Sequence, residues 1–88
     1  MICCWQTVRG STERRFQTDV LSIYQRLKKR KGFKLIAYGF NYDCWVFTKS
    51  FKKPENARKS LRRISNQEIF FNSNDNTFYA KNISTEDN

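Results

Sequence analysis

The sequence predicts an α+β domain in which two helices cover one face of an antiparallel sheet. Two segments carry apolar residues at helical spacing, and five others are rich in β-forming residues and end near turn-forming residues. The aromatic content of 16% excludes an ordinary disordered chain. The 88 residues leave room for one core and no second domain. We therefore expect one basic domain over residues 1–83, followed by a frayed acidic tail at 84–88.

A first helix is predicted at about residues 12–31. From Phe16 to Leu27, apolar side chains recur at spacings of four, three, one and three residues, which places them on one face of a helix. Glu13 would lie in the first turn, where the helix dipole favours an anion. Gly32 follows the predicted last turn, as is typical of a helix end.

A second helix is predicted to begin near Pro54, because proline is favoured in a first helical turn. Ala57, Leu61 and Ile64 lie at positions i, i+4 and i+7 and would form its packed face. At about 100° per residue, the cations of this segment centre on the opposite side and should point into solvent. These cations are Arg58, Lys59, Arg62 and Arg63.

Strands are predicted at residues 2–8, 33–40, 42–48, 67–71 and 77–83. The second and third are so close in sequence that they should form an antiparallel hairpin. The expected order is strand, helix, strand, strand, helix, strand, with an extra C-terminal strand. This is the ferredoxin-like split βαβ arrangement (βαββαβ), which many unrelated proteins share and which does not determine function.

The cysteine and histidine counts bear on chemistry. The chain has no histidine, which removes the commonest general base and metal ligand. Cys3, Cys4 and Cys44 are an odd number in a chain that we expect to be cytoplasmic, so a disulfide framework is not expected. We expect these thiols to fill strand positions, and we expect neither a metal site nor a cofactor.

The start of the chain carries no predicted targeting segment. Residues 1–5 are not a basic segment that precedes a long apolar stretch, so we expect no signal peptide and a cytoplasmic location. No apolar run in the sequence is long enough to predict a membrane span.

The charge balance is strongly positive. Lys and Arg number 17 against eight Asp and Glu, a formal net charge of +9. The cations are concentrated in residues 26–34, at 49–53 and in the second helix, with few acids among them, and such self-repulsion destabilises the fold unless an anion offsets it. A nucleic acid is therefore the expected partner. The candidate phosphate contacts are Arg26, Lys28, Lys29, Arg30, Lys31, Lys34, Lys52, Lys53, Arg58, Lys59, Arg62 and Arg63.

Aromatic residues form a second candidate set. If the helices cover one face of the sheet, the other face is open, and exposed aromatic rings beside cations can stack on unpaired bases. The alternative is that these rings belong to the core or to a homodimer interface, since a large exposed apolar patch is usually covered. The candidates for stacking or an interface are Tyr38, Phe40, Trp45 and Phe47, with Trp5 as an additional member.

These observations favour a small intracellular nucleic-acid-associated protein or regulator that is not an enzyme. A Ser-His-Asp triad is impossible without histidine, and the sequence has no Gly-rich phosphate loop. One alternative is a phage- or plasmid-type inhibitor or adaptor whose basic surface docks on a larger nucleoprotein complex. The other is a small basic ribonuclease that uses Arg, Lys and Tyr side chains.

Overall fold

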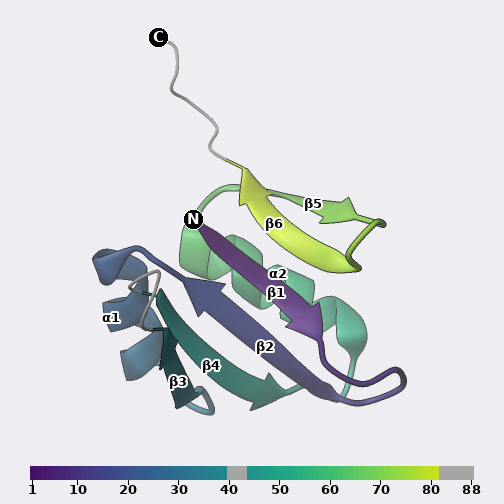
Figure 1. Cartoon of the computed structure of the whole chain (residues 1–88), viewed down its shortest axis with the longest axis horizontal. Coiled ribbons are helices and arrows are strands. Elements are labelled where there is room, and N and C mark those ends of the chain that lie inside the picture. Colours follow the sequence, from purple (N-terminus) through teal and green to yellow (C-terminus); the bar gives the residue numbers. More distant parts are fainter. Residues whose placement is uncertain (40–43, 82–88) are drawn as a thin grey trace, which may run out of the picture.

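The structure is a computed structural model that describes residues 1–39 and 44–81. An α+β domain with two helices on an antiparallel sheet is confirmed, and the sheet has the strand order β3-β4-β2-β1-β6-β5. Figure 1 shows the strands in front of α2. The elements are β1 (Ile2–Gln6), β2 (Glu13–Thr18), α1 (Leu21–Lys29), β3 (Lys34–Gly39), β4 (Cys44–Ser50), α2 (Pro54–Ser65), β5 (Glu68–Asn72) and β6 (Thr77–Lys81).

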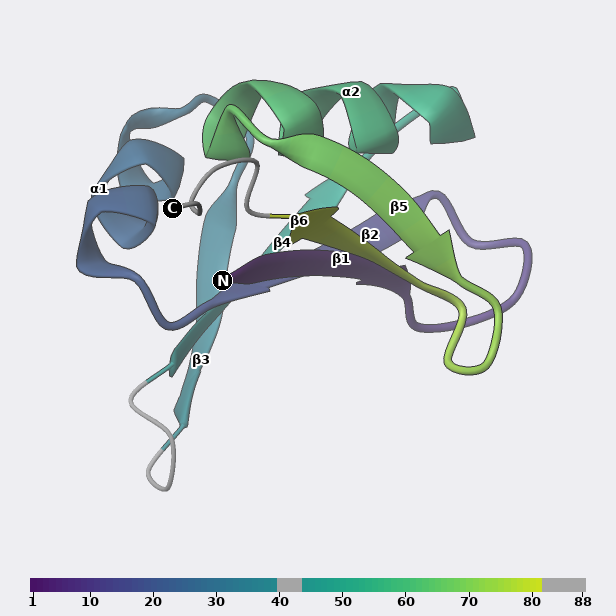
Figure 2. The ribbon, with the colours of Figure 1, turned by 90° about the horizontal axis from the view of Figure 1, so that it is seen from above.

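The two helices lie on the same side of β1 and β2, and β5 rises beside α2 (Figure 2). Helix α2 packs across β1, β5 and β6, whereas α1 packs against α2 and β2. Among the described residues, the other side of the sheet is not covered by a helix, and we call it the uncovered face. Neither described helix combines the length and the apolar character that crossing a membrane requires.

The predicted first helix is wrong over its first half, because residues 13–18 form strand β2. Phe16 and Thr18 are buried while Arg15 and Gln17 are only half-buried, which is the alternation of a strand. Gly10, with φ of +84°, lies in the turn that lets β2 fold back antiparallel to β1. The helical spacing that began at Phe16 therefore holds only for the residues of α1 itself.

The ferredoxin-like strand order is also wrong. In that arrangement, the strand that follows the second helix pairs with the strand that precedes the first helix. Here that position beside β2 is taken by β1, so the order of elements is ββαββαββ. The hairpin of β5 and β6 extends the sheet beyond β1. The predicted antiparallel hairpin of β3 and β4 is confirmed.

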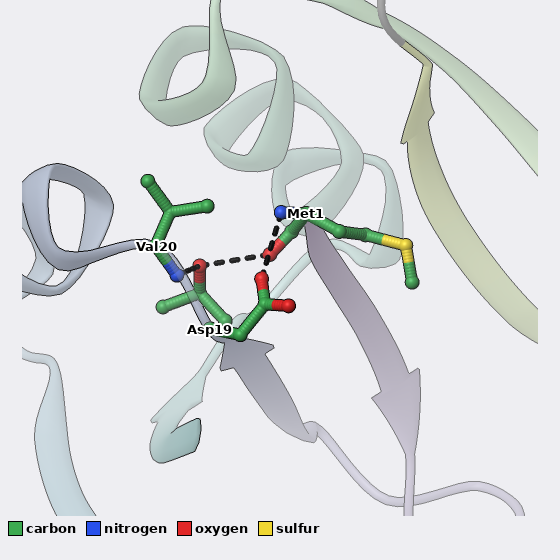
Figure 3. Close-up of polar contacts among 4 residues, drawn as sticks. Met1, Asp19 and Val20 are labelled. Carbon is green, nitrogen blue, oxygen red and sulfur yellow. Dashed lines mark hydrogen bonds and ion pairs between the residues drawn. The ribbon is translucent and has the colours of Figure 1, made fainter. Parts of the chain in front are cut away.

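Two polar contacts tie the start of β1 to the end of β2, and a third joins the end of β2 to the residue before α1 (Figure 3). The Thr18 hydroxyl donates to the Met1 carbonyl at 2.8 Å and accepts from the Val20 N–H at 3.1 Å. The Met1 ammonium donates to the Asp19 carboxylate at 2.8 Å, and this bond lowers the pKa of that carboxyl. Helix α1 has no side-chain N-cap. The bond from the Val20 N–H to the Thr18 hydroxyl instead fixes the backbone just before the helix.

Helix α2 begins and ends as its sequence suggests. Pro54 occupies its first turn together with Glu55, as predicted. Asn66 ends the helix in the left-handed conformation with φ of +53°, a cap that asparagine tolerates well. The predicted turn at residues 73–76 joins β5 to β6. Phe40, the last two residues of the predicted strand 77–83 and the predicted tail at 84–88 lie outside the described residues.

The cysteines occupy strand positions, as predicted. Cys3 and Cys4 lie in β1, Cys44 begins β4, and all three thiols are free. Cys4 is fully buried under the helices, and burial raises the pKa of its thiol to about 12. Burial likewise raises the pKa of Cys3 to about 11.

These pKa values predict that the protein loses stability at high pH. Above pH 9 the unfolded chain releases the Cys4 proton while the folded chain keeps it, so the free energy of unfolding should fall, by up to about 1.4 kcal/mol per pH unit for this thiol. Urea denaturation at pH 8, 9 and 10 measures the slope. The Cys4→Ala variant should show a shallower slope, and an identical slope in both proteins would contradict the prediction.

Candidate nucleic-acid interface

The outer face of α2 carries four exposed cations. Ala57, Leu61 and Ile64 are buried against the sheet, as the helical spacing predicts, which turns the charged side chains away from the core. Within residues 1–39 and 44–81, the sole ion pair joins Met1 and Asp19, so no carboxylate neutralises these four cations by direct contact. The four residues are Arg58, Lys59, Arg62 and Arg63.

A groove runs along each side of α2. The first lies between α2 and β5, where Ile69 and Glu68 face all four cations and Glu55. The second lies on the opposite side of the helix, where Lys49 and Phe51 face Lys59 and Arg63. Since Lys59 and Arg63 border both grooves, the positive charge of α2 extends over the ridge between them.

Lys49 connects α2 with the loop that follows α1. Its Nζ donates to the Lys31 carbonyl at 3.2 Å and lies 4.9 Å from the ring centroid of Phe33. It also lies 5.3 Å from the ring centroid of Phe51. These two rings hold the ammonium in place by cation–π attraction. Gly32, with φ of +90°, permits the close approach, since a Cβ there would lie 3.0 Å from the Lys49 Cε.

Lys49 borders the groove beside α2 and contacts the backbone of Lys31, so two predicted clusters lie next to each other. We call the combined region the helix-side basic surface. It comprises Lys31, Lys49, Arg58, Lys59, Arg62 and Arg63. The sequence places Lys49 in a cationic group but not among the candidate phosphate contacts. The sequence does contain a signal for Lys49: it follows Phe47 by two residues in a strand, so both side chains point to the same side of the sheet.

The remaining predicted contacts are distributed differently. Lys29, Arg30, Lys52 and Lys53 are exposed residues that flank the helix-side basic surface in sequence. The Nζ of Lys28 lies 5.7 Å from the ring centroid of Tyr24, a residue of α1. Lys34 pairs with Thr48, which alternates with buried Phe47, so it lies on the uncovered face. The structure therefore does not bring Lys34 together with the α2 cations.

Arg26 has a structural role. Its Nη1 donates at 2.8 Å to the carbonyl of Ile64, near the C-terminus of α2, and so satisfies a backbone acceptor left over by the helix. Arg62 makes a similar contact, since its Nη1 donates to the Gln67 carbonyl at 3.1 Å. The positive side chains also interact favourably with the negative end of the α2 dipole.

We predict that Arg26→Ala lowers the free energy of unfolding by about 1 kcal/mol, because a charged hydrogen bond between the two helices is lost. Lys29→Ala is the matched control, since Lys29 is also an exposed cation in the last turn of α1. It should change stability by less than about 0.5 kcal/mol. Urea denaturation of both variants makes the comparison, and equal effects would contradict a structural role for Arg26.

The aromatic candidates lie largely on the helix side of the sheet, which corrects the expectation that they line its open face. Phe47 is 1% exposed in the core, and Trp45 stacks on Tyr24 of α1 with ring centroids 4.4 Å apart. Tyr38 is 48% exposed and lies 5.9 Å from Trp45. The reason is that Val46 and Thr48, the alternate residues of β4, face away from the helices.

Other aromatic residues occupy the uncovered face. Trp5 pairs with Arg15 in the register of β1 and β2. Tyr79 pairs with Cys3 and stacks on Phe70, with ring centroids 5.7 Å apart. Phe70 and Tyr79 are not among the candidates predicted from the sequence, because which side of their strands is uncovered depends on the pairing of β6 with β1. A homodimer interface on the uncovered face would use these rings rather than Trp45 and Phe47, and the dimer stays a prediction.

No group of three or more Cys, Asp or Glu side chains that could hold a metal ion is found in the part of the chain that the structure describes. Comparisons with protein-family models, with curated proteins and with solved structures find no match to this chain.

Proposed function

We propose that the protein binds nucleic acid through the phosphates, with the helix-side basic surface as the contact region. One observation carries this proposal: five cations from α2 and β4 lie around two adjoining grooves, with Lys31 next to Lys49, and no carboxylate in the described residues forms an ion pair with any of these six cations. Closely spaced Lys and Arg side chains release counterions when they contact phosphates, which supplies affinity without sequence preference.

A surface that serves only solubility usually mixes both signs of charge. Here the two carboxylates beside the cations, Glu55 and Glu68, lie in the groove between α2 and β5. The groove on the other side of α2 is bordered by Lys49, Lys59 and Arg63 without a carboxylate. The proposal gives the protein a binding role rather than a catalytic one and places it inside the cell, where nucleic acids are accessible.

The first test is the salt dependence of binding. Fluorescence anisotropy with labelled duplex DNA, single-stranded DNA and RNA should show that affinity falls steeply between 50 and 200 mM salt. Six phosphate contacts predict a fall of roughly 10³-fold on a duplex. An affinity that does not change with salt, or no binding at either concentration, would overturn the proposal.

The adaptor hypothesis predicts a different result with the same surface. A protein partner with an acidic patch would be retained in a pull-down after nuclease treatment, whereas partners bridged by nucleic acid would be released. Retention after nuclease, combined with no binding to the labelled probes, would favour docking on an acidic protein surface.

A further inference from the structure

A hollow separate from the two grooves lies at the end of the sheet that carries both the β1–β2 turn and the β5–β6 turn (Figure 2). Its volume is about 590 Å³, which is within the usual range for a ligand site. The lining combines two neighbouring phenylalanines, two arginines and short polar side chains, together with Trp5, whose ring the strand register directs toward the uncovered face. The lining residues are Trp5, Gln6, Thr7, Arg9, Arg14, Phe71, Asn76 and Phe78.

The aromatic part of this pocket is accessible. Phe71 is 50% exposed, and its ring centroid lies 5.0 Å from that of Phe78 on the neighbouring strand. Trp5 is half-buried and lies two strands away from Phe71 in the order β1-β6-β5. An exposed phenylalanine ring beside a second ring offers a flat apolar surface on which a planar ligand can stack.

The polar part of the pocket is held in position. Arg14 Nη1 donates to the carbonyls of Ser11 at 2.6 Å and Glu13 at 3.1 Å, which anchors its guanidinium group. Gln6 Nε2 donates to the same Ser11 carbonyl at 2.8 Å, which leaves its side-chain oxygen as an acceptor. The Glu13 carboxylate accepts from the hydroxyls of Thr48 at 2.8 Å and Thr7 at 3.4 Å. Arg9 is exposed at the turn.

The pocket and the groove between α2 and β5 have lining residues that are close together along β5. Ile69 lines that groove, and Phe71, two residues later on the same side of β5, lines the pocket. Two residues along a strand span about 7 Å, so Ile69 and Phe71 bring the groove and the pocket close together. A chain whose phosphates contact the α2 cations can therefore reach the pocket with its next nucleotides.

We propose that this pocket accepts an unpaired base of a single-stranded nucleic acid, an inference that rests on the proposed function of the helix-side basic surface. The base stacks on Phe71, its polar edge meets the amides of Gln6 and Asn76, and its phosphate is attracted by Arg9 and Arg14. The combination of a ring surface, amide groups and guanidinium groups matches the three parts of a nucleotide.

Phe71→Ala tests the proposal, with Phe70→Ala as the matched control. Both phenylalanines lie in β5 and are about half exposed, but they point to opposite faces of the sheet. Phe71→Ala should weaken binding to a 15-nucleotide single strand by about 5- to 100-fold, because one base loses its stacking partner. It should leave duplex affinity and the salt slope unchanged, and Phe70→Ala should change neither. Phe71→Tyr keeps the ring and should bind like the wild type.

The outcomes separate the two proposals. If the wild-type protein binds neither probe, the function proposed for the helix-side basic surface fails. If it binds both probes and Phe71→Ala matches Phe70→Ala on the single strand, only the base pocket is overturned. A free mononucleotide that binds as tightly as the 15-mer would overturn the link between pocket and groove. If the wild-type protein binds the single strand more tightly than the duplex, and Phe71→Ala removes this preference while Phe70→Ala does not, the proposal is supported.

Discussion

Replacing the four α2 cations by glutamate should lower the affinity for nucleic acid by roughly 10³-fold or more at 50 mM salt. The change removes four of the six cations of the helix-side basic surface and adds four groups that repel phosphates. The circular dichroism spectrum should change little, because the four side chains are exposed and glutamate favours helices about as well as lysine or arginine. The substitutions are Arg58→Glu, Lys59→Glu, Arg62→Glu and Arg63→Glu.

Two further sets of variants test this prediction: glutamine in place of the four cations, and glutamine in place of the two nearby carboxylates. Glutamine at the same four positions should reduce the magnitude of the salt slope by about 0.9 for each lost phosphate contact on a duplex. Glu55→Gln and Glu68→Gln remove the carboxylates that lie in the same groove and should strengthen binding. If the variant with four glutamates binds with wild-type affinity, α2 is not the contact region.

Phe16→Ala should lower the free energy of unfolding by about 3–5 kcal/mol. Phe16 is fully buried, and its ring centroid lies 5.0 Å from that of Phe33 and 5.9 Å from that of Phe51. It also pairs with Cys4 on one side and Phe47 on the other, so its removal leaves a cavity at the centre of the sheet.

Urea denaturation measures this loss, with Phe70→Ala as an exposed aromatic control that should cost less than about 1 kcal/mol. A change at Phe16 no larger than that of the control would mean that β2 does not contribute to the core. Phe16 packs against Phe33 and Phe51, the rings that hold Lys49, so this variant is a test of stability and not of the α2 cations.

The local sequence was sufficient to predict helix α2 but not to predict strand β2. The proline, the apolar spacing of Ala57, Leu61 and Ile64, and the intervening cations all specify the same helix. Residues 13–18, by contrast, contain glutamate, arginine and glutamine, which favour helices, and they precede apolar positions at helical spacing. Their strand conformation comes from pairing with β1 and β4, which is a non-local effect.

The candidate site was predicted in part for similar reasons. The sequence indicates that Trp45 and Phe47 share one side of a strand, but both sides of β4 carry apolar residues. Which side meets the helices depends on how the β3–β4 hairpin is placed against β2. The residues around the pocket proposed to accept a base come from β1, β2, β5, β6 and their turns, and only the strand order brings them together.

The central position of β1 has a consequence for the order of folding. This strand is made before the other strands of the sheet, but one of its two edges pairs with β6, as in the pairing of Cys3 with Tyr79. Until β6 has left the ribosome, that edge presents unpaired backbone N–H and C=O groups, which another chain could use for aggregation. Contacts between such distant segments also slow folding, since a long loop must close first. In the nascent chain, β2 can pair with the other edge of β1 and α2 can cover one of its faces, but the edge that faces β6 stays open until the β5–β6 hairpin is made.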